Sequence, residues 1–113
     1  MTIEVVNRRL SFEFSQDQRL RLVYIGRGSV WGNPFPMKNK SMSERLRVID
    51  EFEDYLLESP HLLSKLPSLS SKVLSCFCAP LPCHGHVLAH YSESLISTGR
   101  LPVSPVVFPK APW

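Results

Sequence analysis

The chain has 113 residues, 43% of them hydrophobic and 20% charged, which suits one small globular domain and excludes a multidomain protein. No stretch approaches the roughly 18 consecutive apolar residues of a membrane span, and the first residues lack the pattern of a signal peptide, so we expect a cytoplasmic protein with no membrane partner. The net charge of +3 combines basic excesses over residues 1–40 and 60–113 with an acidic excess over residues 41–59. The basic segments could attract a nucleotide or a nucleic acid or could simply favour solubility.

Two segments near the start have the β-branched and aromatic residues of strands, residues 3–6 and residues 20–25. The chain between them, residues 7–18, is predicted as a loop or an irregular hairpin, in which residues 10–14 could add a short strand. Residues 26–36 contain three glycines and two prolines, and this composition predicts a structured loop.

The clearest helix covers about residues 41–58, where Ser41 and Glu44 have the spacing of a capping box. An apolar stripe recurs along it at helical intervals. The stripe consists of Leu46, Ile49, Phe52, Tyr55 and Leu56. The acidic residues fall on the other face, so we expect them to form the solvated side of this helix. Pro60 ends the helix, and residues 61–66 could form one further turn.

Residues 72–77 predict a third strand, and a last helix is expected at about residues 85–97, with Gly99 as its stop. This order of elements predicts a small α/β domain of Rossmann-like type, with two or three layers, three to four strands and two main helices. Residues 23–25 and 73–76 would be neighbouring central strands whose loops leave from their carboxyl ends, where ligands bind in such sheets.

The α/β domain should span residues 1–99, and residues 100–113 should form a proline-rich tail. Four prolines exclude regular secondary structure in the tail, but its apolar residues make it unsuited to float freely in solvent. These apolar residues are Val103, Val106, Val107, Phe108 and Trp113. We therefore expect an extended segment that lies across the domain or against a partner, and it could support a homo-oligomer.

The first candidate site is the glycine-rich loop after the second strand. Its candidate ligand-binding residues are Gly26, Arg27, Gly28, Ser29, Trp31 and Asn33. The glycines would let backbone amides approach a ligand, Arg27 could bind phosphate or a carboxylate, and Trp31 could stack on a base. The pattern has no further glycine at the dinucleotide spacing and no phosphate-loop lysine, so a tight turn with Trp31 and Phe35 in the core explains it equally well.

The second candidate site is a cluster of three cysteines, Cys76, Cys78 and Cys83, followed by His84 and His86. The odd number of cysteines argues against a disulfide framework. Alternate residues of an extended strand share a face, so Cys76 and Cys78 together with Cys83 and His84 could form a tetrahedral zinc site. The spacing lacks the usual second pair of zinc ligands.

Three other interpretations of this cluster stay open. Cys83 could be a nucleophile whose pKa is lowered by the helix start and a neighbouring histidine, with Cys83, His84 and His86 as catalytic candidates. The thiols could simply be packed strand residues. The backbone amides of Cys83, His84 and Gly85, at the helix start, could bind phosphate or another anion, and this is the interpretation that we favour.

The two motifs together, residues 24–35 and 76–89, resemble a family of small phage and bacterial proteins that is classed as a domain of unknown function. The resemblance covers about residues 1–95 and implies a compact α/β domain in a phage or mobile-element context, within an infected or host bacterial cell. It carries over Gly26, Arg27, Trp31, Gly32, Asn33, Pro34, Cys76, Cys78, Cys83 and His84. The family pattern has an acid where this chain has His86, which puts any role of that acid as a general base or ribose acceptor in doubt.

We therefore expect a pocket for a nucleotide or a nucleotide-derived small molecule between the glycine-rich loop and residues 83–86. Arg27 and the helix-start amides would bind phosphate, Trp31 would stack, and Asn33 would read the base or ribose, so that the protein binds, processes or sequesters the molecule, for instance a defence signal. One alternative is a zinc-stabilised module that binds nucleic acid or a host protein. The other is a thiol-dependent enzyme that modifies nucleotides.

Overall fold

The computed structural model describes residues 3–111 and contains a sheet of three parallel strands in the order β1-β3-β2. The strands are β1 (Glu4–Asn7), β2 (Leu22–Tyr24) and β3 (Val73–Cys76). Leu74 of the central strand lies opposite Val5 of β1 and Val23 of β2. The prediction that the second and third strands of the chain are neighbours is therefore confirmed, and all three strands end at the same edge of the sheet.

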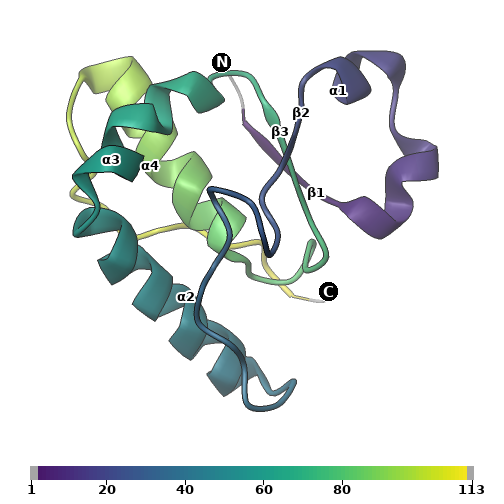
Figure 1. The fold of residues 1–113 in the computed structure, drawn as a ribbon, viewed down its shortest axis with the longest axis horizontal. Coiled ribbons are helices and arrows are strands. Elements are labelled where there is room, and N and C mark those ends of the chain that lie inside the picture. The colour runs from purple at the N-terminus through teal and green to yellow at the C-terminus, as the bar shows by residue number, and fades with distance from the viewer. Residues whose placement is uncertain (1–2, 112–113) are drawn as a thin grey trace.

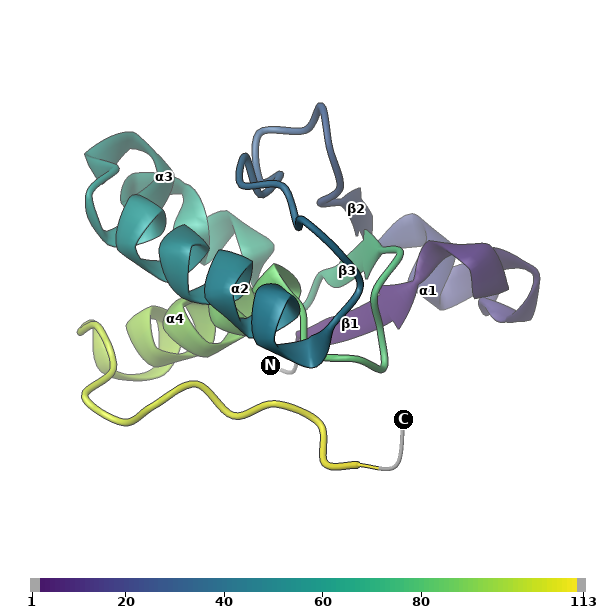
Figure 2. The same cartoon turned by 90° about the horizontal axis from the view of Figure 1, so that it is seen from below.

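Helical segments cover both sides of the sheet. The long helices α2 (Met42–Leu57) and α4 (His84–Thr98) lie on one side with the short α3 (Pro60–Lys65) and the 3₁₀ helix η2 (Leu66–Leu69). The 3₁₀ helix η1 (Arg8–Glu13) and the short α1 (Gln16–Leu20) lie on the other side, as Figures 1 and 2 show. The predicted α/β class, with two main helices, is confirmed.

The segment between β1 and β2 differs from its prediction, because residues 10–14 form no strand. The Asn7 side chain accepts a hydrogen bond from the backbone N–H of Arg9 and starts η1. Ser15 and Gln18 then form a reciprocal capping box that starts α1. Side-chain caps thus turn the backbone away from strand geometry, and none of the residues of η1 is buried.

Helix α2 confirms one half of its predicted capping box and most of its predicted stripe, because the Glu44 carboxylate accepts from the backbone N–H of Lys38 and not from that of Ser41. The Ser41 hydroxyl accepts a hydrogen bond from the backbone N–H of Glu44. Ile49, Phe52 and Leu56 are buried, whereas Leu46 and Tyr55, also expected in the stripe, are 43% and 36% exposed. Val48 is buried in their place, so the buried face is rotated slightly from the predicted one.

The start of α4 rests directly on the sheet. A Cβ atom at Gly85 would lie only 2.8 Å from Cδ1 of Ile25 and 3.1 Å from Cγ1 of Val5. Glycine therefore allows this close approach, and Val87 and Leu88 of the same helix are fully buried behind it. As a result, the first turn of α4 lies beside the carboxyl ends of the strands.

The proline-rich tail is extended and crosses the domain alongside α4 (Figure 2). Val106 and Phe108 pack against the hydrophobic core, and Nε2 of His90 lies 3.0 Å from the carbonyl oxygen of Ser104. Val103 and Val107 are exposed, so an oligomer formed through the tail stays a prediction. Trp113 lies outside the described residues. None of the helices within residues 3–111 has both the length and the hydropathy to cross a membrane.

Candidate metal centre

The fold brings all three cysteines together at the carboxyl edge of the sheet. Cys76 ends β3 and Cys83 is the N-cap of α4, and both are buried, whereas Cys78 in the loop between them is half-buried. The three Sγ atoms lie within 4.8 Å of one another, and those of Cys76 and Cys83 are 3.2 Å apart. Asn7 holds the loop in place, because its Nδ2 donates a 2.8 Å hydrogen bond to the carbonyl of Ala79.

His84, the fourth residue of the predicted zinc set, lies beside these thiols. Its Nε2 is 2.8 Å from the carbonyl oxygen of Ile25, which can only accept, so Nε2 carries the proton of the neutral ring. Burial lowers the pKa of His84 and keeps the ring neutral. Nδ1 therefore has a lone pair that can accept a hydrogen bond from the Cys83 thiol, whose Sγ lies 3.6 Å away.

The thiols differ in their acidity. Hydrogen bonds from Cys76 and Cys83, together with the nearby Arg45 guanidinium, hold the pKa of Cys78 far below its usual range. Donation of a hydrogen bond to Cys78 raises the pKa of Cys76, although the bond from Cys83 partly offsets this, and donation to both Cys76 and Cys78 raises the pKa of Cys83. The expected lowering of the Cys83 pKa is therefore wrong: hydrogen bonds to Cys76 and Cys78, and then burial, outweigh the effect of the helix start.

Backbone amides also contact the sulfur atoms. The N–H of Cys78 points at Sγ of Cys76, with 3.5 Å between nitrogen and sulfur, and the N–H of Gly85 approaches Sγ of Cys83 at 3.4 Å. Such contacts place positive dipoles next to the sulfurs and favour their charged form. Arg45, on α2, adds a full positive charge beside Cys78. The sequence interpretation missed this residue, because nothing in the neighbouring sequence indicates that it belongs to the site.

The structure gives His86 a structural task. Its Nδ1 accepts a 3.0 Å hydrogen bond from the backbone N–H of Cys83, which makes it the third residue of a capping box at the start of α4. Glutamate and glutamine are the usual residues at such a position because they too supply an acceptor. A histidine at position 86 therefore supplies the acceptor that this cap needs.

The helix-start amides are largely occupied by these internal contacts. The N–H of Cys83 is bonded to His86, and the N–H of Gly85 lies against sulfur. An anion at this helix start would have to displace both acceptors. Cys83 itself is only 1% exposed. The phosphate interpretation of the helix start and the nucleophilic role of Cys83 both stay predictions.

The glycine-rich loop is likewise engaged in the fold. Trp31 is 7% exposed and belongs to the hydrophobic core, so stacking on a base would require its ring to leave that core. Asn33 donates to the carbonyl of Val48 and accepts from the N–H of Phe35, both at 2.9 Å. Ser29 donates to the carbonyl of Gly26 at 2.6 Å, while Arg27 is exposed. A nucleotide pocket between this loop and α4 stays a prediction.

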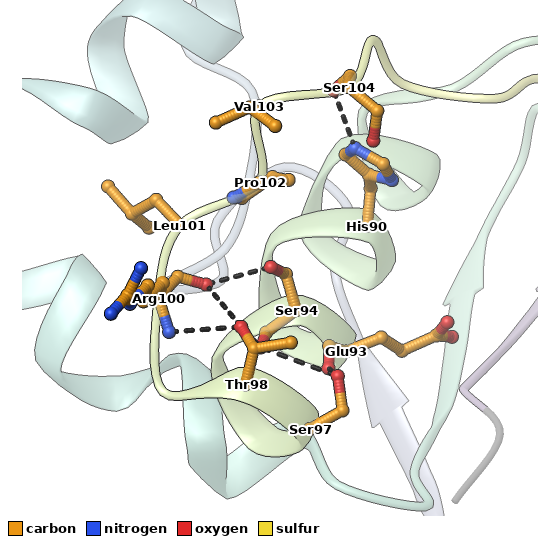
Figure 3. Close-up of a pocket in the computed structure, with 10 residues that line it drawn as sticks. All are labelled: His90, Glu93, Ser94, Ser97, Thr98, Arg100, Leu101, Pro102, Val103 and Ser104. Atoms are coloured by element: carbon orange, nitrogen blue, oxygen red, sulfur yellow. Dashed lines mark hydrogen bonds between the residues drawn. The ribbon is translucent and has the colours of Figure 1, made fainter.

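Two cavities formed by the described residues lie elsewhere. The larger, of about 700 Å³, opens between the end of α4 and the tail, where Ser94 and Thr98 donate to the carbonyl of Arg100 (Figure 3). The smaller, of about 330 Å³, lies between β1, α4 and the tail. Neither is lined by the cysteines, Arg27 or Trp31.

Comparison with protein families identifies a match. The family model described as "Domain of unknown function (DUF4326)" matches residues 12–94, a range that includes the glycine-rich loop and all three cysteines. No curated protein and no solved structure matches the chain.

Proposed function

Because the chain belongs to the family described as a domain of unknown function, DUF4326, we propose a function from its own geometry: a zinc-binding domain whose ion is held by Cys76, Cys78, Cys83 and His84. The observation that carries the proposal is the gathering of three Sγ atoms within 4.8 Å of one another. Thiolate sulfur and imidazole nitrogen are the preferred ligands of structural zinc, which they bind in a tetrahedron.

The distances around Cys83 fit such an ion after a small adjustment. Zinc–sulfur bonds of about 2.3 Å in a tetrahedron separate two sulfurs by about 3.8 Å, and a sulfur and an imidazole nitrogen by about 3.5 Å. Nδ1 of His84 already lies 3.6 Å from Sγ of Cys83. The sulfurs of Cys76 and Cys83, now 3.2 Å apart and hydrogen-bonded, would separate by about half an ångström when the ion replaces their protons.

The surroundings also suit a metal centre. A histidine that binds zinc through one nitrogen typically donates its other N–H to a carbonyl, as His84 does to Ile25. Three thiolates, a neutral imidazole and Zn²⁺ together carry one negative charge, and the Arg45 guanidinium would offset it. The amide contacts at Cys76 and Cys83 would stabilise the thiolates.

A site with four protein ligands leaves no open position for water or substrate, so the ion would have a structural role. It would tie the end of β3 and the loop after it to the start of α4. Because the unfolded chain has no preformed site, the binding energy would add to the stability of the fold.

The proposal is tested by the metal content of the purified protein and by its spectrum with Co²⁺ in place of zinc. We expect one zinc per chain and the intense near-ultraviolet bands of thiolate-bound tetrahedral Co²⁺. Cys78→Ser and His84→Gln should weaken binding, whereas the control His61→Gln, at an exposed histidine of α3, should not. Removal of zinc by a chelator should lower the melting temperature, since a ligand at a thousand times its Kd stabilises by about 4 kcal/mol.

A protein that is purified without metal, binds no added zinc or Co²⁺ and keeps its melting temperature in chelator would overturn the proposal. Binding that persists unchanged in His84→Gln would remove His84 from the set and leave the three thiols.

A further inference from the structure

Two arginines of η1 lie over aromatic rings at the edge of the sheet. Cζ of Arg8 is 5.0 Å from the ring centroid of Tyr24, at the end of β2. Cζ of Arg9 is 5.5 Å from the ring centroid of Phe77, directly after β3. The two rings meet edge to face with their centroids 6.4 Å apart. These four residues, which we call the arginine–aromatic cluster, therefore form one continuous surface from three segments of the chain.

The arginine–aromatic cluster is exposed to solvent and positively charged. Phe77 is 47% exposed, and Arg8 and Arg9 are exposed. Within residues 3–111, no carboxylate lies within ion-pair distance of Arg8, Arg9 or the exposed Arg27, whereas Arg21 contacts both Glu4 and Asp17. The half-exposed Phe77 ring, with Arg9 over it, buries little apolar surface in the folded chain, and such an exposed apolar group is typical of a binding surface.

We propose that the arginine–aromatic cluster binds single-stranded nucleic acid. Unstacked bases stack on aromatic rings and on guanidinium planes, and arginines bind the phosphates between them. Such a strand would cover Phe77 and neutralise Arg8 and Arg9 together. An acidic peptide would satisfy the guanidinium groups but offers no flat surface for the ring, and a duplex keeps its bases stacked out of reach.

In one respect the inference rests on the proposed function. Phe77 lies between Cys76 and Cys78, so an ion bound to both cysteines would fix the backbone that presents the ring. Arg8 and Tyr24 lie outside that loop, and their contact needs no metal. The two proposals can therefore fail separately.

The test is fluorescence anisotropy of a labelled oligothymidylate and a labelled oligouridylate, each of about 12 nucleotides, with the full chain at low salt. Comparison of the two oligonucleotides also distinguishes binding of DNA from binding of RNA. The variant R8A/R9A should bind at least tenfold more weakly, and the slope of log K against log salt should become shallower by about 1.4, since each phosphate contact on a single strand contributes about 0.7. The matched control Lys65→Ala removes an exposed cation from α3, on the other side of the sheet, and should leave binding unchanged.

A second pair of variants tests the stacking. Phe77→Ala should weaken binding at least about fivefold, and Phe77→Trp should retain it, because stacking on one ring contributes 1–3 kcal/mol. Zinc content and melting temperature are measured on every sample. Binding that depends on Arg8, Arg9 and Phe77 in a protein that takes up no added zinc or Co²⁺ would support this inference and reject the metal site.

Three results would overturn the inference: a zinc-loaded, folded protein that binds neither oligonucleotide, equal weakening by Lys65→Ala and R8A/R9A, or competition by polyglutamate as strong as that by unlabelled oligonucleotide. The last result would assign the surface to an acidic protein instead.

Discussion

Glu44 links the start of α2 to the loop before it. Its Oε1 accepts a 2.9 Å hydrogen bond from the backbone N–H of Lys38, and its Oε2 lies 2.8 Å from Nε of Arg47. The Arg47 guanidinium, and then the Lys38 amide, lower the pKa of Glu44 from 4.5 to about 2. The ionised carboxylate therefore favours the folded state.

This shift predicts a pH dependence of stability. Because the folded pKa lies below the unfolded one, the stabilisation by Glu44 is fully present above about pH 4.5 and disappears as the pH falls through about 2. We expect Glu44→Gln to unfold at lower urea than the wild type at pH 7, and at the same urea below pH 2. Urea titrations followed by circular dichroism measure this, with Asp50→Asn, at an exposed position of the same helix, as the control. A difference that persists below pH 2 would contradict the assignment.

The candidate metal site shows how far single residues could be predicted. Cys76, Cys78, Cys83 and His84 were accessible from the sequence because they are close neighbours along the chain and their side chains are typical zinc ligands. Arg45 was not, because its position beside Cys78 depends on how α2 packs against α4 in the folded chain. The same holds for the raised pKa of Cys83, which is determined by hydrogen bonds that only the folded loop creates.

At the scale of elements, the glycine-rich loop is shaped by its own hydrogen bonds. The N–H of Ser29 donates to the carbonyl of Gly26 at 3.2 Å, and that of Gly32 donates to the carbonyl of Ser29 at 3.1 Å. A Cβ atom at Gly32 would lie 2.7 Å from the Gly26 carbonyl oxygen, which is backbone and cannot rotate away. The glycine at position 32 is therefore required by a close approach within the loop.

This geometry predicts a ranking of two substitutions. Gly32→Ala should destabilise the protein by about 3 kcal/mol, because the loop must open to admit the methyl group. Gly28→Ala should cost only about 1 kcal/mol, because Gly28 has a φ of +87° but open space around it. Urea unfolding of both variants measures the order, and equal losses would show that the turn does not constrain Gly32.

Elements whose apolar residues recur at a clear interval were predicted from the sequence, and elements without such an interval were not. The strands and the two long helices repeat apolar residues at intervals that reflect a buried face. By contrast, η1 and α1 have no buried residue, so no hydrophobic period marks them. Only the side-chain caps at Asn7 and Ser15 define them, and Leu10 and Phe12 suggested a strand although both are exposed.

At the scale of the whole molecule, the tail packs as part of the folded structure. Phe108 is half-buried, lies edge-on to the ring of His86 with centroids 5.8 Å apart, and contacts the core. Phe108→Ala should destabilise the protein by about 1–2 kcal/mol, less than the 3–5 kcal/mol of a fully buried phenylalanine. Val103→Ala, at a fully exposed tail residue, should change stability by less than about 0.5 kcal/mol. Thermal unfolding of both variants decides whether the tail unfolds with the domain.

The order of the strands has a consequence for how the chain folds. The central strand, β3, is the last of the three in the sequence, so β1 and β2 have no strand to pair with until residues 73–76 are available. The chain between β1 and β3, and that between β2 and β3, must close into long loops before any two strands can pair. Closing such loops slows folding. During synthesis on the ribosome, the two early strands therefore emerge with unpaired edges, and they are the segments most prone to aggregate or to recruit a chaperone before the third strand arrives.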